Sequence, residues 1–214
     1  MTRRHFEPGQ PVHAIQRGNN RATVFHEPRD ARFYLDWLGE AAADEGVALH
    51  AYVLMTNHLH LLVTPATAAG LGRCMQSVGI KYTRYINATR GRTGTLWDGP
   101  YRAAPITDEA YFMTCSGYIE MNPVRAGLAA NPGAYRWSSY KANADGAADP
   151  LVTPHALYLA IGPTPAIRQA AYREMFSETL ADTALTTIRD ATNAGTAIVS
   201  GYARRKPGRP KRNI

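Results

Sequence analysis

The sequence predicts an α+β fold: a ferredoxin-like antiparallel sheet with helices on one face, followed by a C-terminal helical extension. Hydrophobic residues at 45% and charged residues at 19% describe a globular chain. Strand-like and helix-like segments follow one another in the order strand, helix, strand, strand, helix, strand, helix, which is compatible with that sheet. Only Thr56 and Asn57 separate the two middle strands, and so short a link predicts an antiparallel hairpin.

Apolar spacing and turn residues define the first elements. Gly18 and the two asparagines after it close the first strand. Apolar residues recur at helical spacing in the segment that follows, and strand formers dominate the two strands of the hairpin. The predicted segments are a strand at 11–17, a helix at 28–45, and strands at 47–55 and 58–64.

The later elements end in a helix that carries candidate chemistry. Thr107 is predicted to cap it, with acidic residues next, where the helix dipole favours negative charge. The helix is expected to end near Asn122, because the residue before Pro123 resists the helical conformation. The predicted segments are a helix at 71–87, a strand at 101–106 and a helix from 107 to about 122.

Composition divides the chain into three parts. Residues 142–149 are rich in alanine, aspartate and glycine and are interpreted as a linker, so a first domain is assigned to residues 1–145. Helical patterns resume within residues 146–200, which are interpreted as a helical accessory region. Residues 201–214 form a basic tail that is expected to be disordered.

Positive charge is concentrated in two places. The net charge is +7, yet residues 73–102 carry six basic and one acidic side chains, and residues 201–214 carry six basic and no acidic ones. Such concentration favours a polyanion, nucleic acid first and an anionic membrane second. No apolar run approaches the roughly 18 residues of a membrane span, so no membrane partner is expected. The glycine-rich motifs of nucleotide binding are absent, so nucleotide-driven chemistry has no support.

Two features indicate a cytoplasmic location. The first residues lack the apolar segment of a signal peptide. The two cysteines, Cys74 and Cys115, make no disulfide framework and fit a reducing compartment.

His58-Leu-His60 is the first candidate for chemistry. On a strand, alternation places both imidazoles on one face and Leu59 on the other. Two imidazoles at this spacing can bind one divalent ion. A pair of merely solvated or hydrogen-bonded histidines is an equal alternative for the motif taken alone. The position favours metal, because nothing structural requires two histidines in a leucine-rich strand.

Tyr118 is the second candidate. It shares a helical stripe with Asn122 one turn later, so a phenol and a carboxamide lie side by side. A phenol can attack phosphorus, but its ordinary pKa of about 10 makes it a weak nucleophile without a metal or a base. With 12 tyrosines in the chain, spacing alone favours an ordinary half-buried tyrosine.

The ordered set of motifs decides between these alternatives. His58-Leu-His60 and Tyr118-Ile-Glu-Met-Asn122-Pro-Val-Arg-Ala-Gly127 together resemble the single-tyrosine HUH transposases, specifically the REP-associated tyrosine transposases. The similarity covers roughly residues 10–140. Further similar segments are Arg17–Arg21, His50–His58, Arg92–Trp97 and Trp137–Tyr140.

The resemblance implies an HUH endonuclease fold and a metal-dependent transposase that cleaves and rejoins single-stranded hairpin DNA, such as a repetitive extragenic palindrome. His58 and His60 would hold Mg²⁺ or Mn²⁺, with Asn122 as the third protein ligand. Tyr118 would attack the phosphate, remain attached as a 5′-phosphotyrosine and release a 3′-hydroxyl. The implied protein is a monomer or homodimer in the bacterial cytoplasm, associated with the nucleoid. In dimeric relatives the tyrosine helix can be exchanged between subunits.

Two positions depart from the family's pattern. Gly117 precedes the tyrosine, and Pro100 follows the Trp-x-Gly segment, where the relatives commonly carry arginine. Both changes remove expected phosphate contacts and leave the chemical residues in place. A glycine inside a helix also costs roughly 1 kcal/mol relative to alanine.

The basic middle of the chain supplies candidate DNA contacts. Single strands are bound by cations along the backbone and aromatic faces under the bases. Tyr82 and Tyr85 are expected to be core instead, because they lie on an apolar helical stripe. The candidate DNA-binding residues are Arg17, Arg21, Lys81, Arg84, Arg90, Arg92, Trp97, Arg102, Arg125 and, in the tail, Arg209.

The tail adds a separable basic element. Gly208-Arg209-Pro210, flanked by cations, resembles an AT-hook, whose arginine lies in the narrow minor groove of A·T-rich duplex DNA. A disordered basic tail that holds any DNA nonspecifically is an equal alternative.

Two rival functions belong to other classes. One is a noncatalytic nucleic-acid-binding protein that keeps the same sheet and tail. The other is a His-x-His hydrolase acting on small molecules, which is disfavoured because no convincing acidic third ligand is found.

Overall fold

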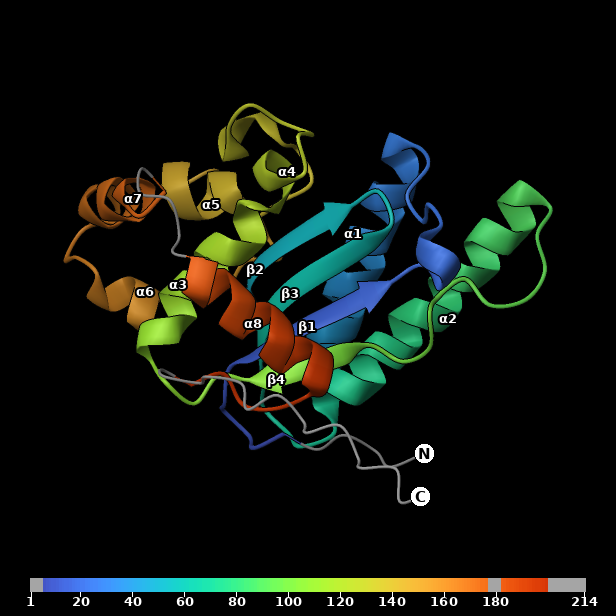
Figure 1. Ribbon diagram of the computed structural model, residues 1–214, viewed down its shortest axis with the longest axis horizontal. Coiled ribbons are helices and arrows are strands. Elements are labelled where there is room, and N and C mark those ends of the chain that lie inside the picture. Colours follow the sequence, from blue (N-terminus) through green and yellow to red (C-terminus); the bar gives the residue numbers. More distant parts are fainter. Residues whose placement is uncertain (1–5, 177–181, 200–214) are drawn as a thin grey trace, which may run out of the picture.

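The computed structural model of the protein describes residues 6–176 and 182–199. At its centre is a four-stranded antiparallel sheet in the order β2-β3-β1-β4 (Figure 1). This confirms the predicted α+β sheet, including the tight hairpin between β2 and β3, where Met55 stands opposite His58. The strands are β1 (Val12–Arg17), β2 (Val47–Met55), β3 (His58–Pro65) and β4 (Arg102–Pro105).

One face of the sheet is covered by the two crossover helices. Alternate side chains of β3, among them Leu59 and Leu61, pack against α1 (Pro28–Asp44) and α2 (Gly70–Arg90). In Figure 1 these helices lie behind the sheet. Tyr82 of α2 is fully buried in this core, as predicted. α1 and α2 correspond to the helices predicted from sequence at 28–45 and 71–87.

The opposite face is also covered, so the expectation of helices on one face was incomplete. Leu62 of β3 and Ala104 of β4 pack against α3 (Ala110–Glu120) and α8 (Asp182–Ala194). Figure 1 shows α8 crossing in front of the sheet. The physical reason is that the hairpin strands also place apolar side chains on this second face, among them Val53 and Leu62, and these need a cover of their own.

The helix that carries Tyr118 begins later than predicted and ends close to the predicted position. It begins at Ala110, where Asp108 Oδ1 accepts the backbone N–H of Ala110, so Thr107 is not its cap. The Thr107 hydroxyl instead donates to the carbonyl of Ile198, at 3.4 Å. The helix ends at Glu120, and a separate short helix, α4 (Asn122–Arg125), follows directly.

The predicted linker is partly helical, and the accessory region does not form a separate unit. Residues 140–145 form α5, in which Asn143 and Ala144 are buried, and Gly146 ends it at φ +70°. α8 returns to the sheet and shares its apolar cluster. In the described residues no helix is long and apolar enough to cross a membrane. The remaining elements are η1 (Asn19–Arg21), η2 (Pro132–Ala134), α5 (Tyr140–Asp145), α6 (Ala156–Ala160) and α7 (Pro165–Glu174).

Candidate active site

His58 and His60 face the same side of the sheet, as their spacing predicts. In the register of the sheet His58 stands opposite Arg17, and His60 stands opposite Ile15 of β1. The two imidazole centroids are 5.1 Å apart. Because side chains alternate along a strand, both rings share the face of Leu62, which is the face covered by α3 and α8.

The surroundings of these imidazoles keep them neutral. His60 is 3% exposed, and burial, followed by nearby imidazole and guanidinium charges, lowers its pKa well below the ordinary value. Burial lowers the pKa of His58 to about 4. The ring of His13 on β1 lies edge to edge with that of His60, with ring planes 4° apart and 2.9 Å between His13 Nε2 and His60 Nδ1. A neutral imidazole keeps one lone pair, which is what a metal ligand needs.

The phenol ring of Tyr118 lies edge-on to two imidazoles. Its centroid is 5.6 Å from that of His60 and 5.7 Å from that of His13. The guanidinium of Arg125, on α4, lies 4.6 Å from the centre of the phenol ring and donates to the Tyr118 carbonyl. A single chain thus brings together the candidate nucleophile, the histidine pair and a cation.

Asn122 is tied to the end of α3. Its Nδ2 donates to the carbonyls of Tyr118, at 2.9 Å, and Ile119, at 3.2 Å. This leaves its carboxamide oxygen to accept from, or coordinate, another group. Among the described residues no three His, Cys, Asp or Glu side chains are placed to hold a metal ion. The residues predicted to hold a metal thus contribute the imidazoles of His58 and His60 and the carboxamide oxygen of Asn122.

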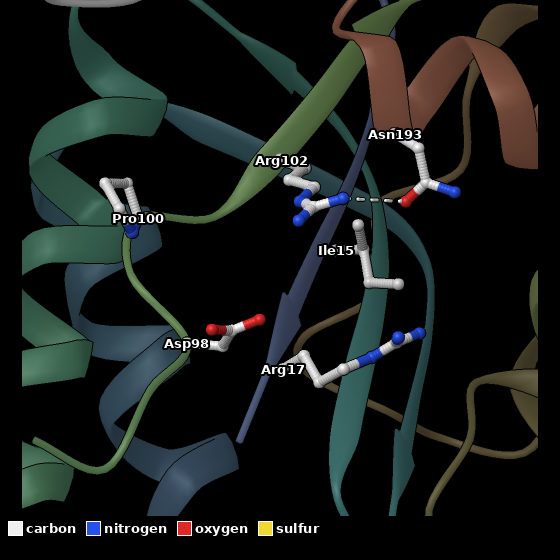
Figure 2. A pocket seen from close by; sticks show the side chains of 6 residues that line it. All are labelled: Ile15, Arg17, Asp98, Pro100, Arg102 and Asn193. Carbon is white, nitrogen blue, oxygen red and sulfur yellow. Dashed lines mark hydrogen bonds between the residues drawn. The ribbon is translucent and has the colours of Figure 1, made fainter. Parts of the chain in front are cut away.

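A shallow groove lies next to the histidine pair (Figure 2). Arg17 and Arg102, both predicted to bind DNA, line this groove. Neither guanidinium makes an ion pair within the described part of the chain. Arg102 Nη1 donates to Asn193 Oδ1 of α8, at 3.2 Å. Pro100, at a position where the resemblance implies arginine, also lines the groove. The lining residues are Ile15, Arg17, Asp98, Pro100, Arg102 and Asn193.

Three predicted DNA-binding residues are not brought to this site. Lys81, Arg84 and Arg90 lie on α2, which packs on the other face of the sheet. Lys81 pairs with Glu40 at 2.9 Å, and Arg90 pairs with Glu27 at 2.6 Å. Acidic residues on and beside α1 therefore offset part of the charge that the sequence concentrates in residues 73–102.

Trp97, predicted to contact DNA, lies in the core of this structure. It is 6% exposed, with its ring centroid 6.1 Å from that of Tyr34 and 5.9 Å from that of Tyr82. In this packing the indole lies against two tyrosine rings rather than at the surface. Arg21 is the last residue of η1, which follows β1, and Arg92 lies in the loop after α2. Arg209 lies outside the described residues.

A buried carboxyl group anchors α3, and sequence reasoning missed it. Glu120 is fully buried and accepts from Ser139 Oγ at 2.5 Å, Asn143 Nδ2 at 2.9 Å and Tyr172 OH at 2.8 Å. Burial raises its pKa to about 7, although these hydrogen bonds oppose the rise. The available signal was an acidic residue in an otherwise apolar helix. Gly117, the second departure from the family's pattern, is buried in the same helix.

The chain is similar to solved structures and to one protein family. A solved REP-associated tyrosine transposase bound to a REP hairpin is similar over 72% of this chain and 92% of its own, with a TM-score of 0.57 and 14% identity. A Deinococcus radiodurans protein assigned as a transposase is similar over 56% of this chain and 95% of its own, with a TM-score of 0.40 and 19% identity. A comparison with curated proteins finds no match.

The family model described as "Transposase IS200 like" matches residues 9–122, more than half of the 214 residues. The matched segment begins before β1, contains the histidine pair and Tyr118, and ends at Asn122. The chain therefore belongs to the family of IS200-like transposases.

Proposed function

We propose that this transposase is a metal-dependent endonuclease and strand transferase that acts on single-stranded hairpin DNA through a covalent tyrosine intermediate. The observation that carries the proposal is the position of the Tyr118 ring, 5.6 Å from the His60 ring in the same chain. An ordinary helix tyrosine has no need of two imidazoles and a guanidinium around it. A tyrosine that attacks a metal-bound phosphate needs both the imidazoles, to hold the metal, and the guanidinium, to attract the phosphate.

In the proposed reaction the phenolic oxygen of Tyr118 attacks the scissile phosphorus. A P–O bond forms to the tyrosine, the bond from phosphorus to the 3′-oxygen breaks, and the 3′-oxygen leaves as a hydroxyl group. The phenol's proton passes to solvent and the leaving 3′-oxygen takes one proton up from solvent, so there is no net change in protons. The product is a 5′-phosphotyrosine, and attack on it by a 3′-hydroxyl reverses the exchange without any other energy source, because one phosphodiester replaces another.

The residues present fit a divalent ion. His58 and His60 would hold Mg²⁺ or Mn²⁺, with the carboxamide oxygen of Asn122 as the third protein ligand. When bound, such an ion polarises the phosphoryl oxygens and stabilises the charge of the transition state. Both imidazoles are neutral at physiological pH because burial lowers their pKa, so no proton competes for the ligand nitrogens.

The cations around the site have separate proposed roles. Arg125, which lies over the Tyr118 ring, would attract the scissile phosphate. Arg17 and Arg102 line the groove beside the histidines and would hold the neighbouring phosphates. A hairpin substrate is supported by the solved transposase of this fold, which was captured with a REP hairpin. We further propose that Arg209 and the tail bind A·T-rich duplex DNA.

One observation favours the noncatalytic alternative. Tyr118 is 5% exposed and His60 is 3% exposed, so a DNA strand reaches them only after the side chains or helices above them shift. A protein that merely binds hairpins would not need that shift. The two functions make opposite predictions about covalent attachment.

The test is incubation with labelled single-stranded hairpins and Mn²⁺ or Mg²⁺, followed by SDS gel electrophoresis. The proposal predicts an SDS-stable adduct that EDTA, Tyr118→Phe and His58→Ala each abolish. Lys81→Ala, on the far face of the sheet, is the matched control and should keep the adduct. An adduct that survives Tyr118→Phe would mean that Tyr118 is not the nucleophile. Hairpin binding without any adduct in wild type would favour the noncatalytic function.

A further inference from the structure

His13 and Thr192 form a hydrogen-bonded chain that ends on His60. His13 Nδ1 lies 2.7 Å from Thr192 Oγ1 of α8, and His13 Nε2 lies 2.9 Å from His60 Nδ1. All three side chains are buried, at 1%, 2% and 3% exposure for His13, Thr192 and His60. His13 and Thr192 are 179 positions apart in the chain. A contact of this kind determines which ring nitrogen carries the proton.

The hydrogen bond made by Thr192 decides which atom donates in each of the other bonds of this chain. Thr192 Oγ1 also lies 2.8 Å from the carbonyl oxygen of Ile188, one turn earlier in α8. A hydroxyl group has one proton, and a carbonyl can only accept. The Thr192 proton therefore goes to Ile188, and His13 Nδ1 must donate to Thr192. A neutral His13 then has its lone pair on Nε2, where it accepts the proton on His60 Nδ1.

We propose that Thr192 and His13 are positioning residues that hold His60 as the Nδ1–H tautomer and so present its Nε2 lone pair to a divalent ion. This inference rests on the metal role given to His60 under Proposed function. The opposite tautomer would place a proton on Nε2 and exclude it as a ligand. The His13 ring is 1% exposed, and a buried position of this kind disfavours a charged imidazole.

His58 reaches the same tautomer by a separate route. Its Nδ1 lies 2.7 Å from Asn57 Oδ1, and Asn57 Nδ2 donates to the carbonyl of Arg21, at 2.9 Å. The second bond defines which end of the amide is oxygen, so Asn57 accepts and His58 Nδ1 donates. Both histidines thus keep Nε2 free. Partners of this kind orient metal-ligating histidines and raise their basicity.

The proposal gives α8 a role in the site. α8 lies in the region assigned from sequence to an accessory unit, yet it supplies the last member of the chain of bonds to His60. Loss of such an outer partner typically weakens metal binding by about 10–100-fold. The expected effect of removing the Thr192 hydroxyl is therefore a weakening of Mn²⁺ binding within that range.

The test has two readouts that do not depend on activity. Long-range ¹H–¹⁵N correlation spectra of the metal-free, full-length protein at pH 7.5 should show His60 with a protonated Nδ1 and an unprotonated Nε2. Calorimetric titration with Mn²⁺ alone should show weaker binding for Thr192→Val than for wild type, with Thr192→Ser restoring it. Thr187→Val is the matched control, because the Thr187 hydroxyl bonds the carbonyl of Thr183 on the same helix and is exposed.

Each outcome decides something. A protonated Nε2 on His60 in the metal-free wild type would overturn the proposal. So would a folded Thr192→Val protein that binds Mn²⁺ as tightly as Thr187→Val does. A wild type that shows the expected tautomer and binds no Mn²⁺ would support the chain of bonds and contradict the metal role under Proposed function, so the two failures are distinguishable.

Discussion

Replacing Glu120 tests how the helix that carries Tyr118 is held. In Glu120→Ala, three buried donors lose their acceptor: Ser139 Oγ, Asn143 Nδ2 and Tyr172 OH. A buried donor left without a partner costs about 1–3 kcal/mol. Here each has a second partner, namely the carbonyls of Tyr52 and His50 and the Ser116 hydroxyl. We therefore assign about 1 kcal/mol to each of the three donors, and we expect the free energy of unfolding to fall by about 3 kcal/mol.

Glu120→Gln should behave differently. Its carboxamide oxygen keeps the bonds from Ser139 and Asn143, and its NH₂ can donate to the Tyr172 hydroxyl once that proton turns to Ser116. The expected cost near pH 5 is below about 1 kcal/mol.

The two side chains also differ in their response to pH. The pKa of Glu120 is raised from 4.5 to about 7 in the folded protein. The native state therefore binds this proton more tightly than the unfolded state does, and the stabilisation is complete below pH 4.5 and is lost as pH rises to 7. Relative to Glu120→Gln, wild type should lose about 1.4 kcal/mol per pH unit, or about 3 kcal/mol over that window.

Urea unfolding of wild type, Glu120→Gln and Glu120→Ala, followed by circular dichroism between pH 4.5 and 8, measures these differences. Contributions from the histidines are common to all three proteins and cancel in the comparison. Glu40→Gln, which changes an exposed ion pair with Lys81, is the control and should differ from wild type by less than about 1 kcal/mol throughout. A Gln variant as unstable as the Ala variant, or one whose advantage shrinks as pH rises, would refute the account of this network.

Three other predictions concern His50, the assembly of the site and the tail. Burial lowers the pKa of His50 to about 4, so the unfolded state binds this proton at a higher pH than the folded state does. As pH falls from 6.5 to 4, the free energy of unfolding of wild type should therefore fall by about 3 kcal/mol relative to that of His50→Asn. Equal urea midpoints for the two proteins across that range would contradict this. Because one chain brings Tyr118 to His60, mixing Tyr118→Phe with His60→Ala protein should restore no covalent adduct; a restored adduct on an SDS gel would show that the tyrosine acts on a partner's histidines. Deleting residues 203–214 removes six cations. The slope of log K for DNA binding against log salt concentration should become smaller by up to about 4 for single strands, while cleavage of a saturating hairpin stays intact. A truncated protein that cannot cleave would contradict the assignment of binding, rather than chemistry, to the tail.

The sheet and its strands could be predicted because their signals are local. Alternation along His58–Thr64 and the two-residue link before it determine the hairpin and the face of each histidine. The position of Tyr118 over His60 was not predictable from spacing, because it depends on α3 crossing the sheet 60 residues later. Resemblance to the family supplied that pairing, and the structure then showed the two rings in contact.

What the sequence could not show depends on long-range burial. Trp97 stands in a basic, glycine-rich segment, and its place in the core depends on Tyr34 and Tyr82, which belong to two other helices. His13 carries no motif, and its bonds to His60 and Thr192 join three distant segments. The charge of residues 73–102 was concentrated in sequence but is divided in space, since Arg102 lies at the groove while Lys81 and Arg90 pair with acidic residues elsewhere.

The central claim is that Tyr118 becomes covalently joined to DNA. The direct measurement is mass spectrometry of the adduct formed with a hairpin oligonucleotide and Mn²⁺, after digestion of both protein and DNA. The account predicts a single modified peptide in which Tyr118 carries a 5′-linked nucleotide, and a free 3′-hydroxyl on the released strand. A nucleotide found on any other residue, or a cleaved strand with no peptide attached to its 5′-phosphate, would contradict it.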